Sequence, residues 1–161
     1  MPADFPQFGR LAGIDYGTVR IGIAICDPER SFASPLSTYT RTQPQSDVQF
    51  FLQLVSEYQI VGFVVGLPVF ASGAESPKSR EARRFGEWLC HATGIPVRFF
   101  DERYTSVEAD EILGRHEMRG KRRKQSVDKL AAQILLTAYL EAPQTAGQPP
   151  PALDGTPPAS D

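Results

Sequence analysis

The sequence predicts a single α/β domain built on a mixed five-stranded sheet that is flanked by helices. Three patterns support this fold class. Ile21, Ile23 and Ile25 alternate with small residues, as in a strand with one bulky face and one small face. Residues 60–65 are continuously apolar and rich in β-branched side chains, which is typical of a central strand buried on both faces. Apolar residues recur at helical spacing between positions 127 and 138.

The first half of the chain is expected to form three strands and a helix. Residues 11–15 form the first strand, and a glycine turn leads into the second, which Asp27 and Pro28 end. Residues 36–40 make a short third strand. Asp47 is then expected to cap a helix whose apolar positions are Val48, Phe51, Leu52 and Val55. The short connections between these strands predict an antiparallel triplet.

The second half is expected to add two parallel strand–helix units. The strand at 60–65 is followed by a helix with Ala82, Phe85 and Leu89 on its inner face. Residues 97–100 form the fifth strand, which leads directly into an acidic pair. Thr105 and Glu108 have the spacing of a capping box and predict a helix start. Ser126 is expected to cap the last helix.

Composition favours one domain with a tail. The chain has 161 residues, 41% of them hydrophobic, which is enough for one core. We expect residues 1–9 to be an N-terminal extension and residues 10–141 to be the folded domain. Residues 142–161 contain six prolines and almost no large apolar side chain, so they are predicted to be a disordered tail.

The cellular compartment is inferred from the cysteines and from apolar runs. Cys26 and Cys90 lack the spacing of a disulfide framework or a zinc site. No apolar run is long enough to cross a membrane, and no signal peptide is visible. We therefore expect a cytoplasmic protein that has no membrane partner.

Positive charge is concentrated in one segment although the formal net charge is -2. Residues 115–129 contain seven Lys or Arg and only two acids. Within this segment, the run Lys121, Arg122, Arg123 and Lys124 is expected to lie in a loop that starts at a glycine. A charge run is often only a solvated surface, but this one lies just before Ser126 and Asp128, beside the proposed metal site. We interpret it as a nucleic-acid-binding element.

Acidic residues lie where the predicted parallel strands end. Asp15 ends the first strand, Asp101 and Glu102 end the fifth, and Asp128 begins the last helix. Ligands gather at the carboxyl ends of parallel strands. Carboxylates clustered there could hold two divalent ions for phosphodiester hydrolysis. Adjacent strand residues point to opposite faces, so the sequence leaves open whether Asp101 or Glu102 faces the ions.

Arg20 and Arg103 follow two of these acidic strand ends and could hold phosphate oxygens. Each candidate also has a simpler interpretation. Asp128 could merely complement a helix dipole, and Glu102 with Arg103 could be a surface ion pair. Trp88 is expected to pack on a helix face rather than to stack on a base.

Four motifs occur in order and together resemble a known family: 15–22 (DYGTVRIG), 65–68 (VGLP), 101–106 (DERYTS) and 127–132 (VDKLAA). This set is similar to the YqgF (RuvX) family of ribonuclease H-like nucleases, over residues 10–141. The resemblance implies a ribonuclease H-like fold and hydrolysis supported by Mg²⁺ or Mn²⁺. It implies Asp15, Asp101, Glu102 and Asp128 as catalytic carboxylates, of which we expect Asp15, Glu102 and Asp128 to bind metal.

The resemblance also implies nucleic-acid partners. Family members are proposed to mature the 5′ end of precursor 16S rRNA or to cleave branched DNA as Holliday-junction resolvases, and a homodimer would suit the latter. One departure is that Val69, Phe70 and Ala71 stand where the family commonly has polar residues after Gly-Leu-Pro. Phe70 could instead stack on a base.

Two other functions remain open at this point. The same basic run would serve an assembly factor that binds nucleic acid with little or no catalysis. An actin-like or sugar-kinase-like nucleotide-binding fragment also opens with an Asp-x-Gly turn, but that class needs two domains around a cleft, which this length cannot supply.

Overall fold

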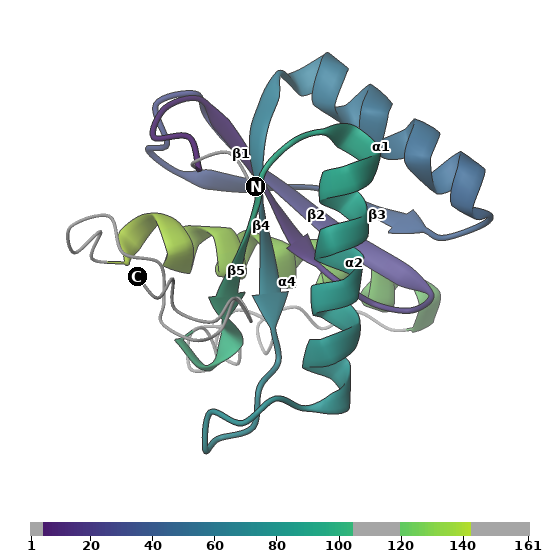
Figure 1. The fold of residues 1–161 in the computed structure, drawn as a ribbon, viewed down its shortest axis with the longest axis vertical. Helices are drawn as coiled ribbons and strands as arrows, with labels where there is room; N and C mark the ends of the chain where they lie inside the picture. Colours follow the sequence, from purple (N-terminus) through teal and green to yellow (C-terminus); the bar gives the residue numbers. More distant parts are fainter. Residues whose placement is uncertain (1–4, 105–119, 143–161) are drawn as a thin grey trace.

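The computed structural model describes residues 5–104 and 120–142. The chain forms a five-stranded sheet of order β3-β2-β1-β4-β5, shown in Figure 1. In chain order the elements are β1 Arg10–Asp15, β2 Arg20–Cys26, β3 Ala33–Thr40, α1 Pro44–Tyr58, β4 Ile60–Leu67, α2 Pro77–Thr93, β5 Val97–Asp101, the 3₁₀ turn η1 Glu102–Tyr104 and α4 Gly120–Glu141.

The pairing of the strands confirms the predicted mixed sheet. The pairs β1–β2 and β2–β3 are antiparallel, whereas β1–β4 and β4–β5 are parallel. Strands β1, β4 and β5 therefore end at the same edge. This edge is where the predicted acidic residues of β1 and β5 lie.

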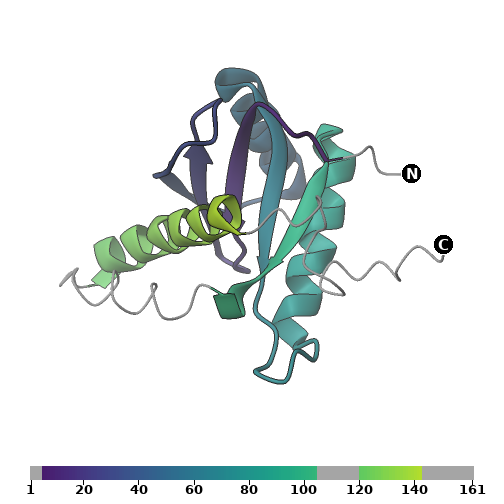
Figure 2. The ribbon, with the colours of Figure 1, turned by 90° about the vertical axis from the view of Figure 1, so that its left-hand side faces the viewer.

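Helices cover both faces of the sheet. Figure 2 shows α4 on one face and α2 on the other. On the α1/α2 face, the bulky side chains of β2 join an aromatic cluster around Phe51, which is fully buried. The small side chains Ala24 and Cys26 belong to the second cluster, which packs on α4. The alternation read from β2 thus assigns its bulky and its small side chains to the two opposite faces of the sheet.

Two glycines allow α4 to lie directly on the backbone of the sheet. Gly13 of β1 and Gly22 of β2 both face α4. A Cβ added at Gly13 would lie 2.9 Å from the Cβ of Leu136, and one at Gly22 would overlap the carbonyl oxygen of Asp128. Any larger residue on this seam would force the helix outward. Glycine at these positions therefore sets the height at which Asp128 sits above the sheet.

Several boundaries differ from the sequence prediction. The third strand begins at Ala33 rather than at residue 36. Helix α1 begins at Pro44 with Gln43 as its N-cap, so Asp47 is not the cap. Instead Asp47 is buried and accepts hydrogen bonds from the Tyr39 hydroxyl and the Thr42 backbone N–H. Leu52, expected to face inward, is 45% exposed.

The last helix also differs from its prediction. It begins at Gly120 rather than at Ser126, so the basic run 121–124 is helical and not a loop. Lys, Arg and Gln are good helix formers, and no glycine or proline interrupts them before Ser126. The helix predicted from Thr105 and Glu108 lies outside the described residues. The N-terminal extension and the Pro-rich tail stay predictions.

Substitution of Gly22 by valine should destabilise the fold strongly. The new side chain would overlap the α4 backbone, and overpacking typically costs about 1–3 kcal/mol and occasionally more; the overlap with backbone puts this change at the upper end. Urea unfolding followed by circular dichroism measures the loss. Gly94→Asn is the control, because Gly94 has positive φ and open space around it. Equal stability of the two variants would contradict the close approach.

Candidate active site

Asp15 lies at the centre of the acidic edge. It is the last residue of β1 and pairs directly with Gly22 on β2, so both residues face α4. Burial raises the pKa of the Asp15 carboxyl to about 8, and repulsion from Glu102 and then from Asp128 adds to the shift. Three acidic groups from separate parts of the chain therefore act on one another.

Asp128 reaches this edge from α4. It is the ninth residue of the helix and not part of its first turn, so the predicted interaction with a helix dipole does not explain it. Its Oδ2 accepts a hydrogen bond from Nε of Arg20 at 2.8 Å. Arg20 begins β2, and the ion pair connects the helix to the sheet beside Asp15. The arginine predicted to hold phosphate is thus engaged with a predicted metal ligand.

The structure separates Asp101 from Glu102. Glu102 lies on the side of Asp15: a Cβ added at Gly66 would be 2.5 Å from its Oε2, and its charge raises the pKa of Asp15. Burial raises the pKa of Glu102 itself; the neighbouring Asp101 adds to this and Lys78 opposes it. Glu102 is therefore the member of the pair that joins the acidic group.

Asp101 serves a different contact. It is fully buried and accepts two hydrogen bonds from Arg103, from the backbone N–H at 2.8 Å and from Nε at 2.6 Å. The same guanidinium donates from Nη1 to the carbonyl of Ala71 at 3.0 Å. Arg103, predicted to bind nucleic acid, thus connects β5 to the loop after β4. Both residues hold the edge of the site in place.

The loop after β4 is fixed from α2 as well. Ser76 caps α2 by accepting from the N–H of Ser79, and its hydroxyl donates to the carbonyl of Pro68 at 2.6 Å. Phe70 in this loop is 53% exposed. The loop is thus held by contacts on both sides, with one aromatic ring left on the surface.

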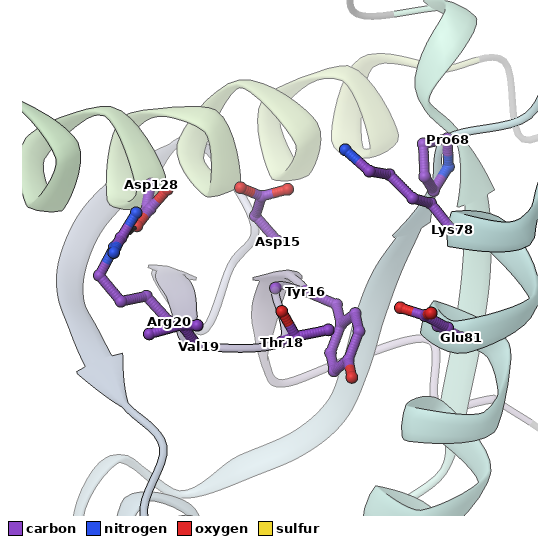
Figure 3. A pocket seen from close by; sticks show the side chains of 10 residues that line it. Asp15, Tyr16, Thr18, Val19, Arg20, Pro68, Lys78, Glu81 and Asp128 are labelled. Atoms are coloured by element: carbon purple, nitrogen blue, oxygen red, sulfur yellow. Dashed lines mark hydrogen bonds and ion pairs between the residues drawn. The ribbon is translucent and has the colours of Figure 1, made fainter.

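A cavity of about 310 Å³ opens in front of Asp15. Figure 3 shows Asp15 and Asp128 on one side of it and Lys78 and Glu81 on the other. Its other walls are the β1–β2 turn with Arg20, and Pro68. Asp15 is half-buried and keeps part of its surface exposed at this cavity.

Sequence reasoning missed Lys78 and Glu81. Both lie in the first turns of α2, where charged residues are ordinary solvated surface. In Figure 3 the Lys78 side chain extends from α2 into the cavity. The sequence offers one signal for them: Lys78 and Glu81 are three residues apart in the segment that follows Gly-Leu-Pro. On a helix, this spacing puts both side chains on one face.

The basic run lies near the acidic group along α4. Residues 121–124 precede Asp128 by four to seven positions, or about 6–10 Å along a helix axis. The four residues are therefore placed on the same helix as Asp128, at its N-terminal end.

The donor set fits a hard divalent cation. Asp15, Glu102 and Asp128 offer only carboxylate oxygens, which Mg²⁺ and Mn²⁺ prefer. Their repulsion, seen in the pKa of Asp15, is what a bound cation would relieve. Within residues 5–104 and 120–142, no three Asp, Glu, His or Cys side chains are already grouped as ligands. Of the two carboxylate oxygens of Asp128, Oδ2 is engaged by Arg20.

Comparison with known proteins identifies the family. A family model described as "RuvX: Holliday junction resolvase" matches residues 9–142. The chain belongs to the RuvX family. It is 48% identical over 144 residues to a Rhodopirellula baltica protein named "Putative pre-16S rRNA nuclease". The matched region covers 89% of this chain and 83% of that protein. A Koribacter versatilis protein of the same name is 41% identical over 133 residues, covering 83% and 87%.

Solved structures support the same fold for this RuvX-family chain. Thermus thermophilus RuvC in complex with Holliday junction substrate matches with a TM-score of 0.53 and 18% identity, covering 88% of this chain and 99% of that one. This similarity confirms the predicted ribonuclease H-like architecture.

No helix within the described ranges has the length and apolar character that a membrane span requires.

The stability of the metal-free protein should fall as pH rises from about 4 to about 8. Folded Asp15 keeps a proton up to about pH 8 that the unfolded chain loses near 3.8, so ionisation favours unfolding across this window. Asp15→Asn removes this contribution and should be more stable than the parent at pH 8 by at least about 1 kcal/mol. Urea unfolding in EDTA measures it. Glu57→Gln, an exposed change on α1, should follow the parent; parallel curves for parent and Asp15→Asn would contradict the shift.

The two adjacent acids should respond oppositely to amide substitution. Asp101→Asn weakens a buried charged hydrogen-bond pair and should lower the free energy of unfolding by about 1.5–3 kcal/mol. It should keep the rise in melting temperature that Mn²⁺ produces. Glu102→Gln should cost little stability but lose that rise. The reverse pattern would make Asp101 the ligand.

Proposed function

We propose that this chain is a divalent-metal-dependent nuclease that hydrolyses phosphodiester bonds in structured nucleic acid. The observation that carries the proposal is the convergence of Asp15, Glu102 and Asp128, two of them lining one cavity, with mutual repulsion that raises the pKa of Asp15. Family membership supports the same activity.

Asp15, Glu102 and Asp128 would hold two divalent ions, and such ions would supply activation of water and stabilisation of charge on the departing oxygen. Asp15 would be the central ligand, since both Glu102 and Asp128 act on its pKa. Arg20 and Lys78 are the cations nearest the cavity, and they would orient phosphate oxygens. Asp101 and Arg103 would act indirectly, by holding the rim.

The physiological substrate we favour is the 5′ end of precursor 16S rRNA. Its support is the printed name of the relatives at 48% and 41% identity. Branched DNA is the second substrate, on the description of the family model. The basic N-terminal part of α4 would contact the phosphate backbone of either. Cytoplasmic location, the choice of Mg²⁺ or Mn²⁺, and a homodimer stay predictions.

Cleavage should depend on metal and on the acidic group. Purified protein is incubated with labelled precursor rRNA and with four-way DNA junctions, with Mg²⁺, Mn²⁺ or EDTA. Asp15→Asn and Asp128→Asn should each lose about 100-fold or more of the rate, because metal stabilisation of the transition state is worth several kcal/mol. Glu57→Gln is the matched control, an exposed acid on α1 outside the site.

The outcomes separate the two main functions. Metal-dependent cutting that Asp15→Asn abolishes establishes the nuclease, and the substrate cut faster identifies its class. Binding without cutting, unchanged in both variants and in EDTA, would instead establish an assembly factor. Cutting by Asp15→Asn at the parental rate would exclude the proposed site.

A further inference from the structure

A second hollow lies next to the acidic cavity, on the far side of the β1–β2 turn. Its volume is about 490 Å³. Tyr16, Thr18 and Glu81 line both spaces, so the two are neighbours that share a wall. Nothing in the acidic chemistry requires this second space.

Aromatic rings form part of its lining. Phe85 packs between Tyr16, with ring centroids 4.9 Å apart, and Trp88, at 5.4 Å. Phe85 is buried, whereas Tyr16 and Trp88 are half-buried and keep ring surface toward the hollow. Trp88 was expected only to pack on a helix face; it does so against Phe85 and also lines this space. Exposed ring surface of this kind accepts a nucleobase by stacking.

Two arginines supply positive charge at the same place. Arg41 lies over the rings of Tyr16 and Phe85 at 5.6 and 5.5 Å, and its Nε donates to the Asp47 carboxylate. Arg84 is exposed at the rim and, within the described part of the chain, makes no hydrogen bond or ion pair. One arginine is thus fixed by the protein, and the other is available to a phosphate.

We propose that this hollow is a subsite for one unpaired nucleotide adjacent to the bond that is cut. The base would stack on Trp88 and Tyr16, and Arg84 would contact a phosphate of the same strand. A paired base already has its faces covered by its neighbours, so this subsite selects single-stranded or splayed nucleotides over continuous duplex. The proposal rests on the proposed nuclease function and adds a preference for an unpaired nucleotide beside the cut.

Tryptophan fluorescence measures occupancy of this hollow directly, because Trp88 is the single tryptophan of the chain. Full-length protein in EDTA is titrated with a short oligouridylate and, separately, with the same RNA annealed to its complement. The single strand should quench tryptophan fluorescence to saturation, and the duplex should quench it markedly less. Absence of quenching, or equal quenching by both, would overturn the subsite.

Two arginines on α2 make a matched pair of variants. Arg84→Ala should weaken single-strand binding by up to about fivefold at low salt, as expected for one exposed ion pair, and reduce the salt slope by about 0.7. Arg80→Ala removes the same charge from the same helix outside the hollow and should bind like the parent. Equal effects of the two changes would reduce the result to general charge attraction and overturn the proposal.

The Asp15→Asn variant distinguishes a failure of the proposed subsite from a failure of the proposed nuclease function. If both hold, the variant should show parental quenching by oligouridylate and no cleavage. Cleavage that depends on Asp15 without any quenching would leave the nuclease intact and remove the subsite alone. Cleavage by Asp15→Asn at the parental rate would instead remove the nuclease site on which the subsite rests, whatever the fluorescence shows.

Discussion

The architecture of the site depends on the contact between the backbone of α4 and the sheet at Gly13 and Gly22. A helix normally stands off a sheet by the length of its side chains. Here the missing Cβ atoms let the main chain of α4 approach the strands directly. Since Gly22 is the cross-strand partner of Asp15, the point of closest approach coincides with the acidic edge. The position of Asp128 therefore follows from a packing constraint rather than from any attraction between carboxylates.

The arrangement of positive charge explains how so many acids coexist at one edge. Asp101, fully buried, is bound by Arg103, and Asp128 is bound by Arg20. Lys78 opposes the rise in the pKa of Glu102, whereas the causes of the shift at Asp15 are burial and acidic neighbours with no such opposing charge. The cost of keeping these carboxylates charged together thus falls mainly on Asp15, whose pKa is raised by burial and by both neighbours.

The sequence predicted the sheet and the acidic edge well because both follow from local patterns. The alternation in β2 and the apolar run in β4 fix the faces of their strands regardless of context. The side of Glu102 could not be predicted, since one residue of register reverses both members of the acidic pair. The start of α4 was misplaced because Ser126 is a good cap, while the helix propensity of the preceding basic run extends the helix upstream. Lys78 and Glu81 resemble any solvated helix surface, and only the tertiary fold shows what they face.

The Arg20–Asp128 ion pair has a consequence for the order of ligand binding. Oδ2 of Asp128 accepts from Arg20, so a cation bound at that oxygen, as proposed, would compete with the guanidinium and favour its release toward an incoming phosphate. Thermodynamic reciprocity then requires that a bound phosphate, by engaging the arginine, raises the affinity of the carboxylate for the cation by the same factor. Under the proposed function, this exchange of partners would make the affinity for the cation highest when nucleic acid is bound.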